Sequence, residues 1–152
     1  MTRGRFIAFE GGEACGKSTQ AALLATALDA VLTREPGGTT IGAAIRSLVL
    51  DPATVGLDRR AEALLMAADR AQHVAEVVEP ALAAGRHVVT DRFAGSSIAY
   101  QGGGRGLPSD EVRRLSEWAT DGVWPDLIVL LDVPAAVAAR RLDRELDRME
   151  SE

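Results

Sequence analysis

The chain has 152 residues, 17 basic and 22 acidic side chains, and a formal net charge of −5. This acidic balance argues against a non-specific nucleic-acid binder, and no apolar stretch is long enough for a transmembrane helix or a signal peptide. The only cysteine, Cys15, cannot form an internal disulfide, which favours a reducing cytoplasm. We therefore expect one cytoplasmic domain over residues 1–152, with no nucleic-acid or membrane partner.

Short apolar runs alternate with longer segments whose apolar residues recur at helical spacing. The predicted strands are residues 6–9, 31–33, 87–91 and 127–132. The predicted helices are residues 17–29, 40–50, 57–84 with an interruption at Pro80, 107–121 and 135–142. Such alternation predicts an α/β fold with a parallel sheet flanked by helices on both faces.

Three polar clusters follow predicted strands, at residues 10–19, 33–38 and 91–106. Ligands of parallel α/β sheets bind at the carboxyl ends of the strands, so these clusters are where a site is expected. The last cluster contains a glycine-rich stretch at residues 100–106, which we interpret as a second ligand loop.

The first cluster contains a phosphate-binding motif. Residues 11–18, GGEACGKS, fit G-x4-G-K-[S/T] and lie between a predicted strand and a predicted helix. Glycines let the backbone amides surround a phosphate, Lys17 can reach the β and γ phosphates, and Ser18 can bind Mg²⁺. Lys17 is also the only lysine among the 17 basic residues, which favours a role that arginine cannot fill.

Arginines elsewhere suggest a second phosphate. Arg70 lies within a predicted helix, and Arg92 follows a strand, where it is expected to point toward the phosphate loop. Either residue alone is more consistent with a structural role, as a solvated charge or a local ion pair. Together with a phosphate loop they favour a site for two phosphates, because guanidinium groups bind dianionic phosphate well.

These motifs resemble those of the thymidylate kinase family. The matching stretches, in family order, are residues 9–19, 33–39 (TREPGGT), 46–48, 91–93 (DRF), 96–97, 99–106 (AYQGGGRG), 125–127 and 146–150. The resemblance implies a P-loop nucleoside-monophosphate kinase fold. It also implies transfer of phosphate from ATP, with Mg²⁺, to thymidine 5′-monophosphate in dTTP biosynthesis, by a homodimer joined through helices such as residues 61–84.

The resemblance assigns a role to each site residue. ATP would be bound by Gly11, Gly12, Glu13, Ala14, Cys15, Gly16, Lys17, Ser18 and Thr19, with Ser18 on the metal. The acceptor would be bound by Glu13 at the sugar, Arg70 and Arg92 at the phosphate, Glu35, and Met66, Ser97, Tyr100 and Gln101 around thymine. Tyr100 below the sugar would disfavour a 2′-hydroxyl. The lid would span about residues 140–150, with Arg144 or Arg148 joining Lys17 and Arg92 in catalysis.

Three features depart from the family pattern. Met66 stands where the family usually has a phenylalanine that stacks on thymine, and Ala14 replaces a glycine of the phosphate loop. Family members also continue beyond the lid motif with a further helix, strand and helix, so we expect a sheet that lacks its last strand. The chain is then either truncated or a natural short form. The alternatives are a form that binds nucleotide without transferring phosphate, and a kinase for another monophosphate.

A GTPase switch protein is disfavoured, because the chain contains no Asn and therefore no Asn-Lys-x-Asp motif.

Overall fold

The computed structural model describes residues 2–142 and 147–151. The strands are β1 (Phe6–Gly11), β2 (Val31–Arg34), β3 (Val88–Asp91) and β4 (Leu127–Leu131). The helices are α1 (Lys17–Leu28), α2 (Thr40–Leu50), α3 (Arg59–His73), η1 (Val74–Val78), α4 (Glu79–Ala83), α5 (Ala94–Ser97), η2 (Ile98–Gly104), α6 (Ser109–Ala119), α7 (Ala135–Arg141) and α8 (Arg148–Ser151).

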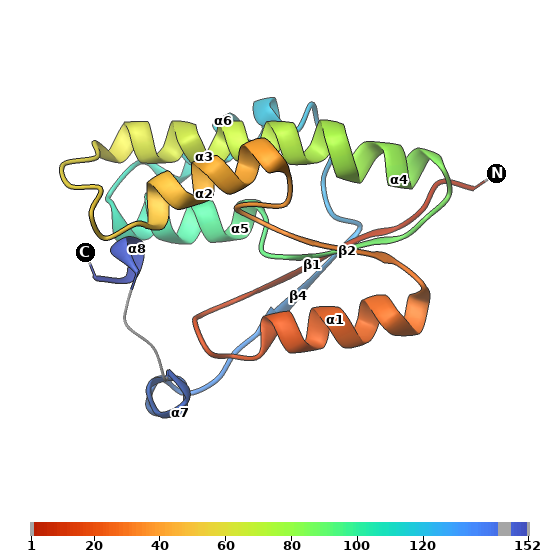
Figure 1. Cartoon of the computed structure of the whole chain (residues 1–152), viewed down its shortest axis with the longest axis horizontal. Helices are drawn as coiled ribbons and strands as arrows, with labels where there is room; N and C mark the ends of the chain where they lie inside the picture. Colours follow the sequence, from red (N-terminus) through yellow and green to blue (C-terminus); the bar gives the residue numbers. More distant parts are fainter. Residues whose placement is uncertain (1, 143–146, 152) are drawn as a thin grey trace.

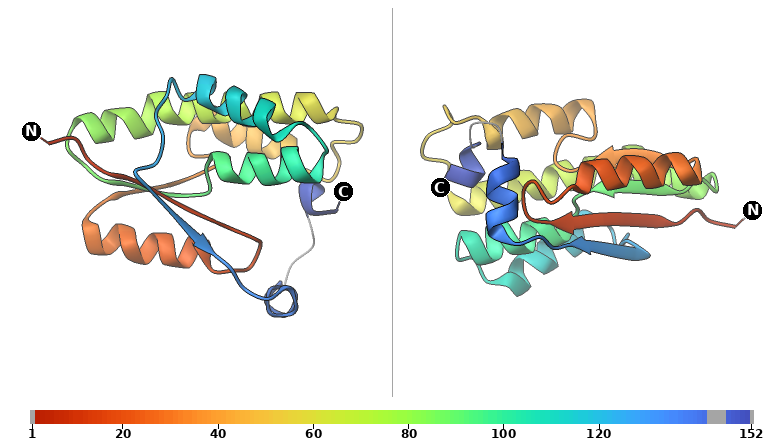
Figure 2. Two further views of the ribbon diagram at one scale, coloured as in Figure 1. Left: turned by 180° about the vertical axis from the view of Figure 1, so that it is seen from behind. Right: turned by 90° about the horizontal axis from the view of Figure 1, so that it is seen from below.

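In the described residues the strands form one parallel sheet in the order β2-β3-β1-β4, which confirms the predicted fold class. Helix α1 covers one face, and α2 to α6 lie over the other (Figures 1 and 2). The central strand β1 is buried on both faces, and its side chains join two separate apolar clusters, one around Phe6 and one around Phe9. The alternation of strands and helices in the sequence therefore predicted these layers correctly.

The long predicted helix is continuous through Pro80. One turn of π-helix, η1, joins α3 to α4, so that the backbone N–H of Glu79 donates to the carbonyl of Val74. Pro80 follows at the second position of α4. The π turn already breaks the i→i−4 hydrogen-bond pattern directly before Pro80, which has no N–H to donate, so the proline lies where an α-helical hydrogen bond is interrupted anyway.

The prediction of a second glycine loop at residues 100–106 was wrong, because residues 98–104 are helical. The preceding helix α5 begins next to a buried carboxylate of strand β1. Glu10, at the end of β1, accepts hydrogen bonds from the backbone N–H groups of Phe93 and Ser96 at 3.0 and 3.2 Å. Gly102 of η2 packs closely against the start of α6, since a Cβ on Gly102 would lie 2.9 Å from Ser109 Oγ. Contacts with β1 and α6, which are distant in the sequence, therefore help to explain why residues 94–104 are helical.

Candidate active site at the carboxyl edge of the sheet

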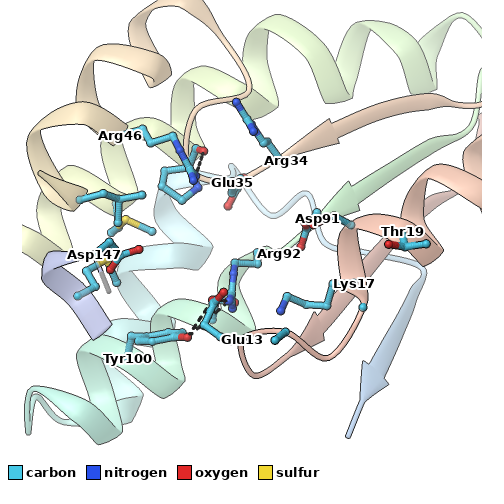
Figure 3. A pocket seen from close by; sticks show the side chains of 18 of the residues that line it. Glu13, Lys17, Thr19, Arg34, Glu35, Arg46, Asp91, Arg92, Tyr100 and Asp147 are labelled. Atoms are coloured by element: carbon cyan, nitrogen blue, oxygen red, sulfur yellow. Dashed lines mark hydrogen bonds and ion pairs between the residues drawn. The ribbon is translucent and has the colours of Figure 1, made fainter. Parts of the chain in front are cut away.

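A cavity of about 460 Å³ lies at the carboxyl ends of β1, β2 and β3, and all three predicted polar clusters contribute to its wall. Figure 3 shows Lys17 and Arg92 on one side of it, Tyr100 and Asp147 on another, and Arg34 and Arg46 above. The register of the sheet explains the convergence, because Phe9 of β1 pairs with Asp91 of β3, and Arg34 of β2 pairs with the same Asp91. The three polar clusters therefore begin side by side at the carboxyl edge of the sheet.

The phosphate loop requires glycine where it passes β4. Gly11 has a φ of 143°, and a Cβ there would lie 2.2 Å from the carbonyl oxygen of Leu131. Ala14 adopts a φ of 55°, a left-handed conformation that is costly for a residue with a Cβ. The Lys17 ammonium is largely buried and donates to the carbonyl of Gly12 at 2.5 Å. The loop is thus curled around its lysine, as phosphate binding requires.

Ser18 and Asp91 form the part of the site that suits a cation. The Ser18 hydroxyl donates to Asp91 Oδ2 at 2.5 Å, and Asp91 Oδ1 is buried with no hydrogen-bond partner among the described residues. A carboxylate that faces a phosphate loop fits Mg²⁺, which binds proteins through one or two carboxylates plus substrate phosphates. Sequence reasoning did not select Asp91, although its place at the end of an apolar strand was a usable signal.

Arg92 lies where predicted, beside the phosphate loop. Its guanidinium donates to the Gly11 carbonyl at 3.2 Å, to Ser96 Oγ at 3.0 Å and to the Glu13 carboxylate, and it packs over the Tyr100 ring at 5.4 Å. A left-handed backbone, with a φ of 71°, accommodates this turn directly after β3. The Glu13 carboxylate therefore holds the Arg92 guanidinium, and an incoming phosphate could take the place of that carboxylate.

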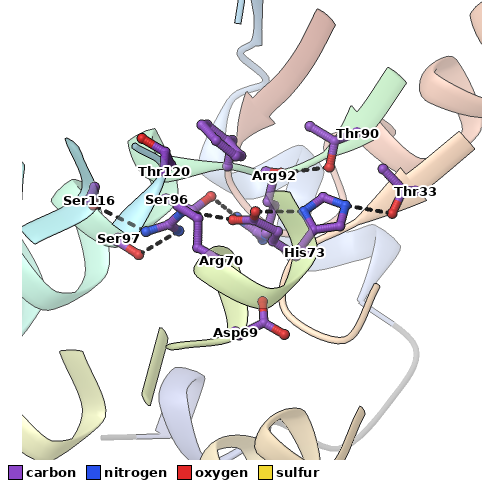
Figure 4. Close-up of polar contacts among 12 residues, drawn as sticks. Thr33, Asp69, Arg70, His73, Thr90, Arg92, Ser96, Ser97, Ser116 and Thr120 are labelled. Atoms are coloured by element: carbon purple, nitrogen blue, oxygen red, sulfur yellow. Dashed lines mark hydrogen bonds and ion pairs between the residues drawn. The ribbon is translucent and has the colours of Figure 1, made fainter. Parts of the chain in front are cut away.

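Arg70, in contrast, lies beneath the cavity and not on its wall. Its side chain is 1% exposed, and its nitrogens donate to Glu35 at 2.8 Å, Ser97 Oγ at 3.0 Å and Ser116 Oγ at 3.1 Å. Glu35 also contacts His73 Nδ1 at 2.7 Å. Figure 4 shows this buried network around Arg70. These contacts use three of the five N–H groups of Arg70, so its predicted contact with the acceptor phosphate stays a prediction.

Arg46 of α2 provides a cation on the cavity wall that sequence reasoning missed. Its guanidinium donates to the Pro36 carbonyl at 3.0 Å. Burial lowers the pKa of Arg46, and so does the nearby Arg34, whereas Asp147 and Asp69 raise it. An arginine remains protonated in such surroundings, so Arg46 brings a partly desolvated positive charge to the cavity.

Asp69 lies next to this region without lining the cavity. It is fully buried, and its Oδ1 accepts a hydrogen bond from the Gly37 backbone at 2.9 Å. Burial raises its pKa to about 6, and the Glu35 carboxylate acts in the same direction, although the Gly37 hydrogen bond opposes the shift. A carboxylate of this kind helps to build the site but is costly to ionise.

The structure brings most of the predicted site residues together. Those on the cavity wall are Glu13, Ala14, Gly16, Lys17, Ser18, Thr19, Glu35, Met66, Arg92, Tyr100 and Gln101. Predicted residues that are described but do not line it are Gly11, Gly12, Cys15, Arg70, Ser97 and Arg148. Wall residues that were not predicted include Arg34, Arg46, Asp91, Arg141 and Asp147. Arg144 lies outside the described residues.

Across residues 2–142 and 147–151, no helix combines the length and the apolar character that crossing a membrane would need. The same residues contain no cluster of three or more His, Cys, Asp or Glu side chains that could hold a metal ion on its own. A cation at Ser18 and Asp91 would therefore need ligands from a bound nucleotide as well.

Known proteins with similar sequence and structure agree on one family. The thymidylate kinase family model matches residues 9–152. A thymidylate kinase of Bifidobacterium longum is 52% identical over 97% of this chain and 76% of its own length, and one of Halothermothrix orenii is 50% identical over 99% and 77%. The crystal structure of thymidylate kinase from Ehrlichia chaffeensis superposes with a TM-score of 0.82, at 37% identity, over 91% of this chain and 82% of that one. The family model, the related sequences and the similar crystal structure agree with the phosphate loop and the parallel sheet described above. The chain belongs to the thymidylate kinase family.

Proposed function

We propose that the cavity binds ATP and thymidine 5′-monophosphate side by side and transfers the γ-phosphoryl group of ATP to the monophosphate. The product would be thymidine diphosphate, a precursor of dTTP. The observation that carries this proposal is the convergence of Lys17, Arg92 and Arg46 on one cavity of about 460 Å³. In-line phosphoryl transfer needs little covalent help, so convergent positive charge and exact placement of the two phosphates supply most of the catalysis.

The donor side is the phosphate loop. Backbone N–H groups of residues 11–19 and the N-terminus of α1 would surround the ATP phosphates, and Lys17 would exchange its contact with the Gly12 carbonyl for the β and γ oxygens. Ser18 and Asp91 would hold Mg²⁺ together with the nucleotide. When bound, the metal neutralises charge on the phosphate oxygens.

The acceptor side lies across the cavity. Arg92 and Arg46 are its cations, and Tyr100, Gln101 and Met66 form the wall on which the thymidine would rest. Glu13 bonds Arg92 and lies 3.4 Å from the Tyr100 hydroxyl, so it lies between the cation proposed for the acceptor phosphate and the ring proposed to lie below the sugar.

Arg70 and Ser97, which lie below this wall, would support the acceptor side indirectly. Arg70 holds Glu35, which is itself part of the wall, and Ser97 holds Arg70. The role that the resemblance implied for Arg70, direct binding of phosphate, therefore passes to Arg46 in this proposal.

Arg141 and Arg144 are the candidates for the lid cation. Arg141 lines the cavity and donates to the Ala14 carbonyl at 3.4 Å, so it lies beside the loop that would bind the donor phosphates. Arg148 instead contacts Glu62 and the Val49 carbonyl, and it is buried. We propose that Arg141, with Arg144 as the second candidate, neutralises charge on the transferred group.

The test is phosphoryl transfer by three purified variants, followed as ADP release coupled to NADH oxidation. Lys17→Ala and Arg92→Ala should each lower kcat by about a hundredfold or more, because each removes a cation that faces the transferred group. Arg114→Ala is the control, since Arg114 is exposed and pairs only with Asp110 on its own helix among the contacts described. Near-normal turnover by Lys17→Ala or Arg92→Ala, with intact circular dichroism, would contradict the proposal.

We also propose that the chain forms a homodimer through α3. Along this helix and η1, the residues Ala61, Leu64, Leu65, Ala68, Ala71 and Ala75 are exposed or half-buried. They recur at helical spacing, and Leu64 is 58% exposed. A stripe of small and apolar residues lets a second helix approach closely, which supports a helix-to-helix interface between two copies.

A further inference from the structure

Glu62 is a buried carboxylate on α3 that does not line the cavity but contacts residues from two other segments. It is 1% exposed. Its Oε1 accepts from Gln101 Nε2 at 2.8 Å and Arg105 Nε at 3.3 Å, and its Oε2 accepts from Arg105 Nη2 at 3.4 Å and from Arg148. We call these four residues the Glu62 cluster. An arrangement with so many donors on one buried carboxylate offsets the cost of burying its charge.

The carboxylate determines how Gln101 is oriented. Burial alone would raise the pKa of Glu62, but the donors Gln101, Arg148 and Arg105 outweigh it and hold the pKa below its ordinary value. Glu62 is therefore ionised near neutral pH and can only accept hydrogen bonds. Gln101 must present its amide N–H to Glu62, and its Oε1, which has no partner among the described residues, remains an acceptor. Gln101 is also a residue of the cavity wall.

The other side of the carboxylate holds the C-terminal segment. Arg148 is 2% exposed, and its Nε donates to the Val49 carbonyl at the end of α2 at 2.8 Å. Its chain neighbours Asp147 and Met149 both line the cavity. The contact of Arg148 with Glu62 therefore ties a wall segment of the cavity to α3.

We propose that Glu62 is a positioning residue for the acceptor nucleotide, because it fixes Gln101 on one part of the wall and, through Arg148, residues 147–149 on another. This inference rests on the proposed function, since it deepens the account of the acceptor half of the cavity. Gln101 lies on the side of the cavity assigned above to the acceptor, whereas the phosphate loop forms the donor side. Loss of the carboxylate charge should therefore weaken binding of thymidine monophosphate and leave the binding of ATP nearly unchanged.

The test is Glu62→Gln, which keeps the size of the side chain and removes its charge. Glu79→Gln is the matched control, because Glu79 lies exposed on the same continuous helix. For Glu62→Gln we expect KM for thymidine monophosphate, and its Kd by titration calorimetry, to rise about tenfold, because Gln101 and residues 147–149 would no longer be held in one geometry. KM for ATP should stay within about twofold of the wild-type value.

An equal rise in both KM values, or a lower unfolding temperature with an unchanged Kd for thymidine monophosphate, would show a merely structural role and overturn the inference. If Glu62→Gln does not fold, Arg148→Lys provides the second test, because an ammonium cannot span both Glu62 and the Val49 carbonyl. The same selective rise is expected there, and its absence would overturn the inference. A wild-type chain that neither binds nor phosphorylates thymidine monophosphate would overturn the proposed function itself.

Discussion

At the scale of single residues, Arg46 and Arg70 both lie on helices, but their surroundings differ. Arg46 lies on the cavity wall, where its only described hydrogen bond is to a carbonyl, that of Pro36. Arg70 is buried with Glu35 as its ion-pair partner. The same substitution in the two residues should therefore have effects of two kinds.

We predict that Arg70→Ala lowers the free energy of unfolding by about 3 kcal/mol or more, because it leaves Glu35 buried without its guanidinium partner. Arg46→Ala should cost less stability and should raise KM for thymidine monophosphate by about tenfold or more, because a phosphate contact with a cation is lost. Urea unfolding and steady-state kinetics on both variants measure the two effects. Equal loss of stability in both variants would contradict this division of roles.

Asp69 predicts a pH dependence of stability. Its pKa rises from an ordinary value of 3.8 to about 6 on folding, chiefly because of burial. The folded state therefore binds a proton more tightly than the unfolded state. The resulting stabilisation is fully present below about pH 3.8, decreases as the pH rises to about 6, and is absent above that value.

Asp69→Asn removes this titration and keeps an oxygen that can accept from Gly37. We predict that the variant gains about 2 kcal/mol relative to wild type between about pH 4.5 and about pH 7.5. Urea unfolding of both proteins at the two pH values provides the measurement. A difference in stability that does not change with pH would show that Asp69 does not carry the raised pKa.

At the scale of elements, the contact of α2 with α3 positions the acceptor half of the cavity. Gly42 of α2 faces Asp69 of α3, and a Cβ on Gly42 would lie 2.4 Å from Asp69 Oδ1. The same helix carries Arg46 and Leu50 to the cavity wall. Any displacement of α2 should therefore change both stability and binding of the acceptor.

We predict that Gly42→Ala lowers the free energy of unfolding by about 1–3 kcal/mol, as overpacking does elsewhere, and raises KM for thymidine monophosphate. Gly103→Ala is the control, because a Cβ on Gly103 would have no atom within 4 Å. Thermal unfolding and kinetics of the two variants test the prediction. A Gly42→Ala protein as stable as the control would mean that the two helices are not closely packed.

At the scale of the whole molecule, the apolar stripe along α3 predicts the oligomeric state. We expect light scattering after size exclusion to give twice the chain mass of 16.0 kDa. Leu64→Glu should give a particle of single mass, because a charge at a 58% exposed position of the stripe would have to be buried on association. Exposed Leu127 on β4 provides the control Leu127→Glu, which should keep the double mass. A wild-type particle of single mass would contradict the proposed dimer.

The layers of the fold and the location of the phosphate loop follow from patterns along the sequence. The alternation of strands with helices, the glycines of the phosphate loop and the single lysine are local patterns. Each can be recognised from residues that are close together in the sequence. The loop around Lys17 and the strand that ends at Asp91 therefore appear where the sequence predicts them.

Contacts between distant segments, in contrast, place Arg46 and Arg92 on the cavity wall and Arg70 in the core. Helical spacing places Met66 and Arg70 on the same face of α3, but of the two only Met66 lines the cavity, because Glu35, Ser97 and Ser116 hold Arg70 from three other segments. The helix over residues 98–104 and the partners of Glu62 likewise depend on contacts between residues far apart in the chain. Such contacts are long-range, and a pattern along one stretch of sequence contains no information about which distant side chain satisfies a buried charge.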